Sequence, residues 1–182
     1  MVEAPPAQRP HPPFWMAAGS PGSIRKAAAR GFNLMLDQYA SPEQIGERMT
    51  LYRAEREAHG RPFDPMGVVV ARQLYVARNR ADAEAALARQ AKYTQRAVSV
   101  SRSPARKGGS HVLAYAGKSG DTEEHALNGT PEEICAKLAT LNAAGARYIL
   151  LTVLGGKEQL RRFAHEVMPA FSATEEGEGN TR

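Results

Sequence analysis

The chain has few of the residues from which disulfides, metal sites or catalytic triads are built. Its 182 residues include one cysteine, Cys135, so neither a disulfide framework nor a cysteine-based metal site can form within it. Cys135 falls in an apolar helical pattern, which predicts a buried structural thiol rather than a nucleophile. The five histidines are scattered without HExxH or similar spacing, so the sequence predicts no metal site and no Ser-His-Asp set.

Long apolar runs and clustered charge of one sign are also missing. No run approaches the roughly 20 residues that span a bilayer, and the first residues lack the apolar segment of a signal peptide. We therefore expect a cytoplasmic protein without a membrane partner. The net charge is +5, but basic residues are interspersed with acidic ones along the predicted helices, so we expect a solvated surface and no nucleic-acid partner.

The chain does contain short apolar runs that alternate with capped amphipathic helices. Two helix starts, at Ser41 and Thr130, combine a hydroxyl N-cap, a proline and a Gln or Glu that completes a capping box. The short, continuous apolar runs predict buried strands at residues 14–18, 33–36, 67–76 and 148–153. Strands that alternate with helices in this way predict an α/β fold with a parallel sheet.

The turn after the first predicted strand is the most informative segment. Residues 19–23 combine glycine, proline and two hydroxyls where a helix begins. A helix amino terminus presents unpaired N–H donors and a partial positive charge, so a phosphate can bind there without a dedicated Lys or Arg. The residues that would form this site are Gly19, Ser20, Gly22 and Ser23. A capped loop without a ligand explains the same residues.

Arg72 interrupts the β-branched run at residues 67–76. Its guanidinium either points toward an anion or pairs with a neighbouring carboxylate, because a buried cation needs a partner. We favour the second, structural interpretation.

The composition divides the chain into one folded unit with flexible additions. Residues 1–12 form a proline-rich leader, and residues 13–171 form the folded domain. Within it, residues 101–120 are rich in Gly, Ser and Lys and predict a mobile insertion, which trypsin would cut first at Arg102, Arg106 or Lys107. Residues 172–182 predict a disordered tail.

Five segments, taken in order, resemble the carboxyl-terminal half of the bacterial luciferase-like family of flavin-dependent monooxygenases and oxidoreductases. None of the five is diagnostic alone, and their common order along nearly the whole chain carries the resemblance. They are residues 10–36, 41–62, 68–87, 128–153 and 159–171.

The resemblance implies a TIM (β/α)8 barrel, of which these segments are strands and helices five to eight. In the family, the turn after the fifth strand contacts the phosphate of reduced FMN or of a deazaflavin, which implies contacts from Gly19, Ser20 and the Ser23 hydroxyl. Some members have an acidic residue where this chain has Gly19. The implied reaction uses reduced flavin and dioxygen on a small organic substrate, or hydride transfer in the deazaflavin branch. No catalytic residue is assigned.

The chain also departs from the family, because a closed barrel needs eight strands and about 250 residues, and only four strands are predicted. We expect a truncated gene product, one member of a split pair, or a fragment that dimerises. Its partner would be a second copy or a complementary amino-terminal half-barrel chain. The principal alternative function is a non-catalytic flavin-binding, phosphate-binding or assembly module. An unrelated small α/β protein that binds a phosphate ligand is the third.

Overall fold

A computed structural model describes residues 7–9, 11–101 and 125–172 of the chain. The expected mobile insertion at residues 101–120 and the expected tail at residues 172–182 lie outside this part, apart from the first residue of each. The trypsin sites Arg102, Arg106 and Lys107 lie outside it as well.

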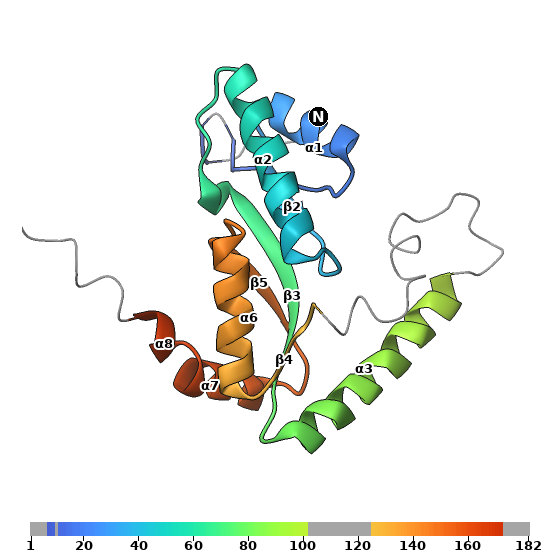
Figure 1. Cartoon of the computed structure of the whole chain (residues 1–182). Coiled ribbons are helices and arrows are strands. Elements are labelled where there is room, and N and C mark those ends of the chain that lie inside the picture. Colours follow the sequence, from blue (N-terminus) through green and yellow to red (C-terminus); the bar gives the residue numbers. More distant parts are fainter. Residues whose placement is uncertain (1–6, 10, 102–124, 173–182) are drawn as a thin grey trace, which may run out of the picture.

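The described residues form one sheet of five parallel strands, and the long strand β3 (Val68–Val76) lies at its centre (Figure 1). Residues 68–70 of β3 pair with β2 (Asn33–Leu36), which in turn pairs with β1 (Trp15–Ala17). Residues 74–76 pair with β4 (Leu127–Gly129), and residues 69–74 pair with β5 (Tyr148–Val153). Residues 69 and 70 of β3 pair with both β2 and β5, and residue 74 pairs with both β4 and β5. The strands β2 and β4 therefore lie one after the other along one side of β3, and β5 lies along the other side.

The helices alternate with these strands as the sequence predicts. They are α1 (Pro21–Ala29), α2 (Pro42–Ala58), α3 (Arg80–Ser101), α6 (Pro131–Ala143), α7 (Lys157–Glu166) and α8 (Pro169–Ser172). Both predicted capping boxes are present: the Ser41 hydroxyl accepts from Gln44 N, and the Thr130 hydroxyl accepts from Glu133 N. The helix α6 ends just before Gly145, which has the left-handed φ of 98° that glycine tolerates best.

The predicted strand positions hold, with differences in detail. The strands at residues 33–36 and 148–153 are confirmed, whereas the first is shorter than predicted and the third begins one residue later. A short 3-10 helix, η1 (Pro65–Gly67), lies before β3, and β4 was not predicted at all.

Two of these strands are also less buried than predicted. Phe14, just before β1, is 47% exposed and Trp15 is 39% exposed. On β5, Tyr148 and Leu150 are exposed as well. The reason is position: β1 and β5 lie at the ends of the sheet, and only one face of each is covered.

The core lies between the sheet and the helices. In a parallel sheet, paired residues point to the same face, and Leu34, Leu36, Val68, Val70 and Leu74 all face the helices with no exposed surface. The apolar faces of the helices contribute Ile45, Met49 and Tyr52 from α2 and Ile134 and Leu141 from α6. The prediction of a buried Cys135 was wrong, because its thiol is only partly buried beside the core. Leu160 on α7 is 48% exposed.

The opposite face of the sheet, which we call the inner face, is concave. Trp15 of β1 and Tyr148 of β5 meet edge to face on it, with their ring centroids 5.9 Å apart. In a flat sheet these two strands, three spacings apart, would be separated by about 14 Å. The sheet is therefore strongly curled. Helices α1, α2, α6 and α7 pack on the convex face, whereas α3 reaches Tyr75 at one end of the inner face through Arg89. Such a curved parallel sheet with an outer helical layer is part of a (β/α) barrel.

Candidate functional site

The predicted turn lies where β1 ends and α1 begins. Ser20 is the N-cap of α1: its hydroxyl oxygen accepts a hydrogen bond from Ser23 N at 3.3 Å. The Ser23 hydroxyl donates to Ser20 O at 3.0 Å, and the two hydroxyl oxygens are 2.6 Å apart. Pro21 has no N–H group and the Ser23 N–H group donates to the Ser20 hydroxyl, so the start of this helix offers the N–H group of Gly22.

The structure brings all four predicted residues together at this helix end. Ser20 and Gly22 are exposed, and a side chain added at Gly22 would meet no atom within 4 Å, so there is open space beside its N–H group. The two hydroxyls bond to each other, and a phosphate would have to replace that bond. The donor set suits an oxyanion, and an anion there remains a prediction.

Two charged residues that sequence reasoning missed lie directly beside this turn. Arg48 of α2 forms an ion pair with Asp37, the residue after β2, with Nη1 and Oδ2 3.0 Å apart. A Cβ atom added to Gly19 would come within 3.0 Å of that Asp37 oxygen and 3.6 Å of the Arg48 guanidinium. Glycine at position 19 therefore lets the backbone approach the ion pair closely, and a cation stands next to the predicted phosphate turn.

The sequence held a signal for one of these two residues. Asp37 directly follows a predicted strand, and the carboxyl ends of neighbouring parallel strands lie at the same edge of a sheet, beside the turn that follows β1. Arg48 gave no comparable signal, because it belongs to a helix whose contacts depend on the packing of α2.

Arg72 is fully buried on the helix-covered face, and its partners are backbone carbonyls. Its guanidinium donates to Asp37 O at 3.2 Å, Ala40 O at 2.7 Å and Ala71 O at 2.8 Å. Burial lowers the pKa of Arg72 to about 10, so the group is still charged at neutral pH. The structural interpretation of Arg72 is thus supported, although it joins β3 to the loop between β2 and α2 rather than binding a carboxylate.

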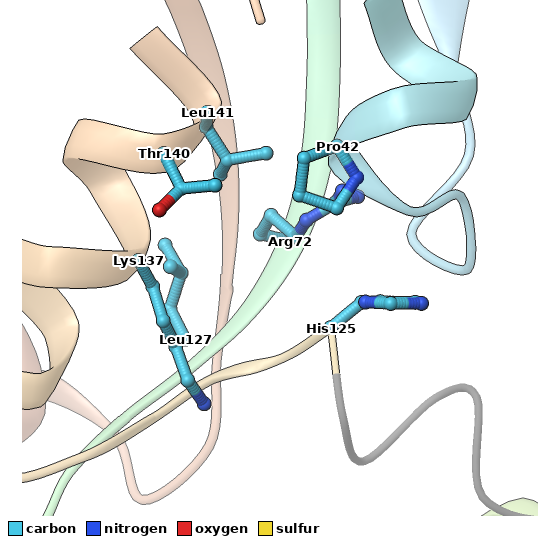
Figure 2. A pocket seen from close by; sticks show the side chains of 7 residues that line it. All are labelled: Pro42, Arg72, His125, Leu127, Lys137, Thr140 and Leu141. Atoms are coloured by element: carbon cyan, nitrogen blue, oxygen red, sulfur yellow. The ribbon is translucent and has the colours of Figure 1, made fainter. Parts of the chain in front are cut away.

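A pocket of about 100 Å³ adjoins Arg72 on this outer side of the sheet (Figure 2). The Lys137 ammonium group leaves the pocket to donate to Ala126 O and Asn128 O at 2.9 and 3.0 Å. The Nε atom of Arg72 is buried without a hydrogen-bond partner. The pocket is lined by Pro42, Arg72, His125, Leu127, Lys137, Thr140 and Leu141.

This pocket faces the helices and not the inner face, because Arg72 pairs in register with Leu151, whose side chain packs against the outer core. It therefore lies apart from the concave side of the barrel.

Other site chemistries can be checked within residues 7–9, 11–101 and 125–172. In this part of the chain, no three His, Cys, Asp or Glu side chains gather in a way that could hold a metal ion. In the same part, no helix is both long enough and apolar enough to cross a membrane.

These observations define a class: an α/β chain that forms part of a parallel barrel, with a turn of glycine, proline and serine that opens a helix at the carboxyl end of a strand. The model of the luciferase-like monooxygenase family matches residues 2–148, and the chain belongs to that family. No curated protein sequence matches this chain.

Solved structures with the same fold include monooxygenase RslO1 from Streptomyces bottropensis. It is 25% identical to this chain, with a TM-score of 0.69 over 91% of this chain and 50% of RslO1. The oxygenating constituent of 3,6-diketocamphane monooxygenase from Pseudomonas putida, in complex with FMN, is 14% identical, with a TM-score of 0.65 over 87% of this chain and 49% of its own.

Another is the coenzyme F420 dependent tetrahydromethanopterin reductase from Methanopyrus kandleri. It is 16% identical, with a TM-score of 0.59 over 87% of this chain and 51% of its own. The chain thus spans about half the length of these three structures.

Proposed function

We propose that this chain is part of a flavin-dependent oxidoreductase of the luciferase-like type that acts on a small organic substrate with reduced FMN or a deazaflavin. The observation that carries the proposal is the family match together with the turn at the carboxyl end of β1, flanked by Arg48. Barrel enzymes place their active sites at this end of the strands. Because the match at 25% identity is to a monooxygenase, we favour monooxygenation over hydride transfer.

In this proposal, the phosphate of the flavin binds at residues 19–23. The donors are the N–H group of Gly22, the hydroxyls of Ser20 and Ser23, and the Arg48 guanidinium. A guanidinium has five N–H donors, and the bond to Asp37 uses one of them, so Arg48 can hold that carboxylate and an oxyanion together. When bound, the reduced flavin supplies the electrons for the reaction.

The test is to reverse the charge of the turn. Replacing Ser20 and Ser23 together by Asp places two negative charges at an anion site, and we expect FMN binding to be lost. Quenching of flavin fluorescence in a titration measures the affinity. The matched control is the pair Thr50→Asp and Thr140→Asp, two exposed threonines on α2 and α6, which should leave the affinity unchanged. Equal affinity in the two double variants would contradict the assignment.

Single changes should have graded effects. Ser23→Ala removes one hydrogen bond and should weaken FMN binding by about 1 kcal/mol. Arg48→Lys keeps the positive charge, whereas Arg48→Met leaves Asp37 as an unpaired negative charge beside the phosphate, so we expect a clearly larger loss for Met. Similar FMN affinities for the Lys and Met variants would show that Arg48 does not contact the phosphate.

We also propose that the barrel is completed by protein outside these 182 residues, either a second copy or a complementary amino-terminal half-barrel chain. The support is the inner face, where Trp15, Tyr148 and Leu150 are exposed although a closed barrel would cover them. We expect a dimer or a heavier species by light scattering. Leu150→Asp should lower the mass, whereas Leu160→Asp on α7, an equally exposed leucine off the sheet, should not.

The open inner face also favours the rival function, a flavin-binding or assembly module without turnover. Water must be excluded from the reactive flavin for oxygen use to yield product rather than hydrogen peroxide. Oxygen consumption and product formation, measured together with a flavin reductase, separate the two. Coupled product formation by the isolated monomer would show that no further half is needed. Bound flavin without oxygen use, even in the assembled form, would establish the module.

A further inference from the structure

A second cavity, of about 310 Å³, lies where β3 and β5 end and beside the first half of α3. It is at the carboxyl end of the strands, as is the turn at residues 19–23. Ligand sites in proteins begin at about this size. The cavity is lined by Tyr75, Ala86, Arg89, Gln90, Leu154 and Gly155.

Gln90 contributes a buried donor to this cavity. The residue is 4% exposed, and its Nε2 atom has no hydrogen-bond partner. A buried amide without a partner is uncommon in folded proteins, because removing it from water is unfavourable unless an acceptor replaces the water. An acceptor atom of a ligand in the cavity would meet that requirement.

Arg89, the preceding residue, contributes a cation. Its guanidinium lies over the Tyr75 ring, 5.5 Å from the ring centroid. The Tyr75 ring is held from its other end, because the Tyr75 hydroxyl donates to Asp82 Oδ1 at 3.0 Å.

Asp82 is the carboxylate that contacts this arrangement, through the Tyr75 hydroxyl. Its second oxygen accepts from Arg78 N at 3.0 Å. Both oxygens are thus engaged, and among the residues that the structure describes no carboxylate lines the cavity itself.

We propose that this cavity binds a small organic carboxylate. The carboxylate would accept hydrogen bonds from the Arg89 guanidinium and the Gln90 amide, and an apolar body would lie on Tyr75, Ala86 and Leu154. That such a ligand is the organic substrate of the flavin reaction rests on the proposed function; the binding itself does not.

Hexanoate is the probe, titrated without flavin and followed by saturation-transfer NMR, with 1-hexanol as the neutral analogue of the same chain length. Arg89→Met and the isosteric Gln90→Glu should each weaken hexanoate binding by about tenfold or more, because each removes or reverses a charge-assisted contact. Binding of 1-hexanol should be weaker in the unaltered protein and little changed in these variants. Arg80→Met, on the exposed face of the same helix, should leave both probes unaffected.

Circular dichroism melts confirm that each variant is folded, and Ala86→Leu, which fills the cavity with apolar atoms, should reduce binding of both probes. Hexanoate that binds no more tightly than 1-hexanol, or equally well to the Arg89→Met protein, would overturn the proposal, as would no binding at all. The FMN titration is independent of these measurements, so a failed flavin site and a failed carboxylate site give different results.

Discussion

On the outer face of the sheet, Leu36 is completely buried under the helices, whereas on the inner face Leu150 retains 41% of its exposed surface. The same strands build both faces. The outer face is covered by helices of this chain, and the Arg72 guanidinium donates there to three backbone carbonyls. The inner face is curved, and Trp15, Tyr148 and Leu150 on it are exposed. The buried core of the chain therefore lies mainly on the outer face, and the exposed side chains of the inner face are those through which we propose association.

The largest expected effect comes from truncating matched leucines on the two faces. Leu36→Ala leaves a cavity in the outer core and should lower the free energy of unfolding by about 3 kcal/mol. Leu150→Ala removes a half-exposed side chain and should change it by about 0.5 kcal/mol or less in the monomer. Urea unfolding followed by circular dichroism, at low protein concentration, measures both. Equal losses would show that the inner face is packed in solution.

Two adjacent residues of β3 place one polar side chain on each face of the sheet. Arg72 faces the outer side, and Arg72→Met would leave the carbonyls of Asp37 and Ala40 without their donor, at an expected loss of about 2 kcal/mol. Gln73 faces the inner side, and its buried Oε1 atom has no partner, so Gln73→Met should be neutral or stabilising. The same urea experiment applies. If Arg72→Met raises the free energy of unfolding, the cost of burying the Arg72 charge exceeds the stabilisation from its three hydrogen bonds.

The smallest effect concerns two tyrosines. Tyr52 on α2 donates to Phe32 O at 2.7 Å, and Tyr52→Phe should lower stability by about 1 kcal/mol. Tyr148→Phe, on the inner face, should have no measurable effect.

Tyr52 also gives a dependence on pH. Burial raises the pKa of the Tyr52 hydroxyl in the folded protein, so its contribution is fully present below the unfolded value of about 10 and is lost as the pH rises through the higher folded value. Unfolding midpoints between pH 8 and pH 11 should therefore fall more steeply for the original protein than for Tyr52→Phe. Parallel curves would contradict this.

Local patterns in the sequence were enough to place most of the fold. The capping boxes at Ser41 and Thr130 fix helix starts through contacts only three residues apart, so they can be read without a structure. The strands at residues 33–36 and 148–153 follow from short apolar runs of the length that strands have. The strand β4 could not be found in this way, because Leu-Asn-Gly has no apolar pattern and becomes a strand only by pairing with the end of β3.

The candidate site likewise contains residues that the sequence predicts and residues that only the packing of helices brings near. Gly19, Ser20, Gly22 and Ser23 are neighbours in the chain, and their grouping at the start of α1 follows from the turn and the N-cap. The ion pair of Asp37 and Arg48 beside Gly19 depends on the position of α2 against the sheet. The cavity at Tyr75 and Gln90 likewise depends on where α3 leaves β3.

Local spacing was sufficient to predict the alternation of strands and helices, two helix caps and the residues of the turn, because these features depend on contacts within one or two helical turns or one strand. The folded structure was needed to show which face of each strand is covered, that Arg72 donates to the carbonyls of Asp37 and Ala40, and that Trp15 and Tyr148 meet across the inner face. These outcomes depend on contacts between residues 30 or more positions apart, and such contacts are set by the curvature of the sheet and the packing of helices on it.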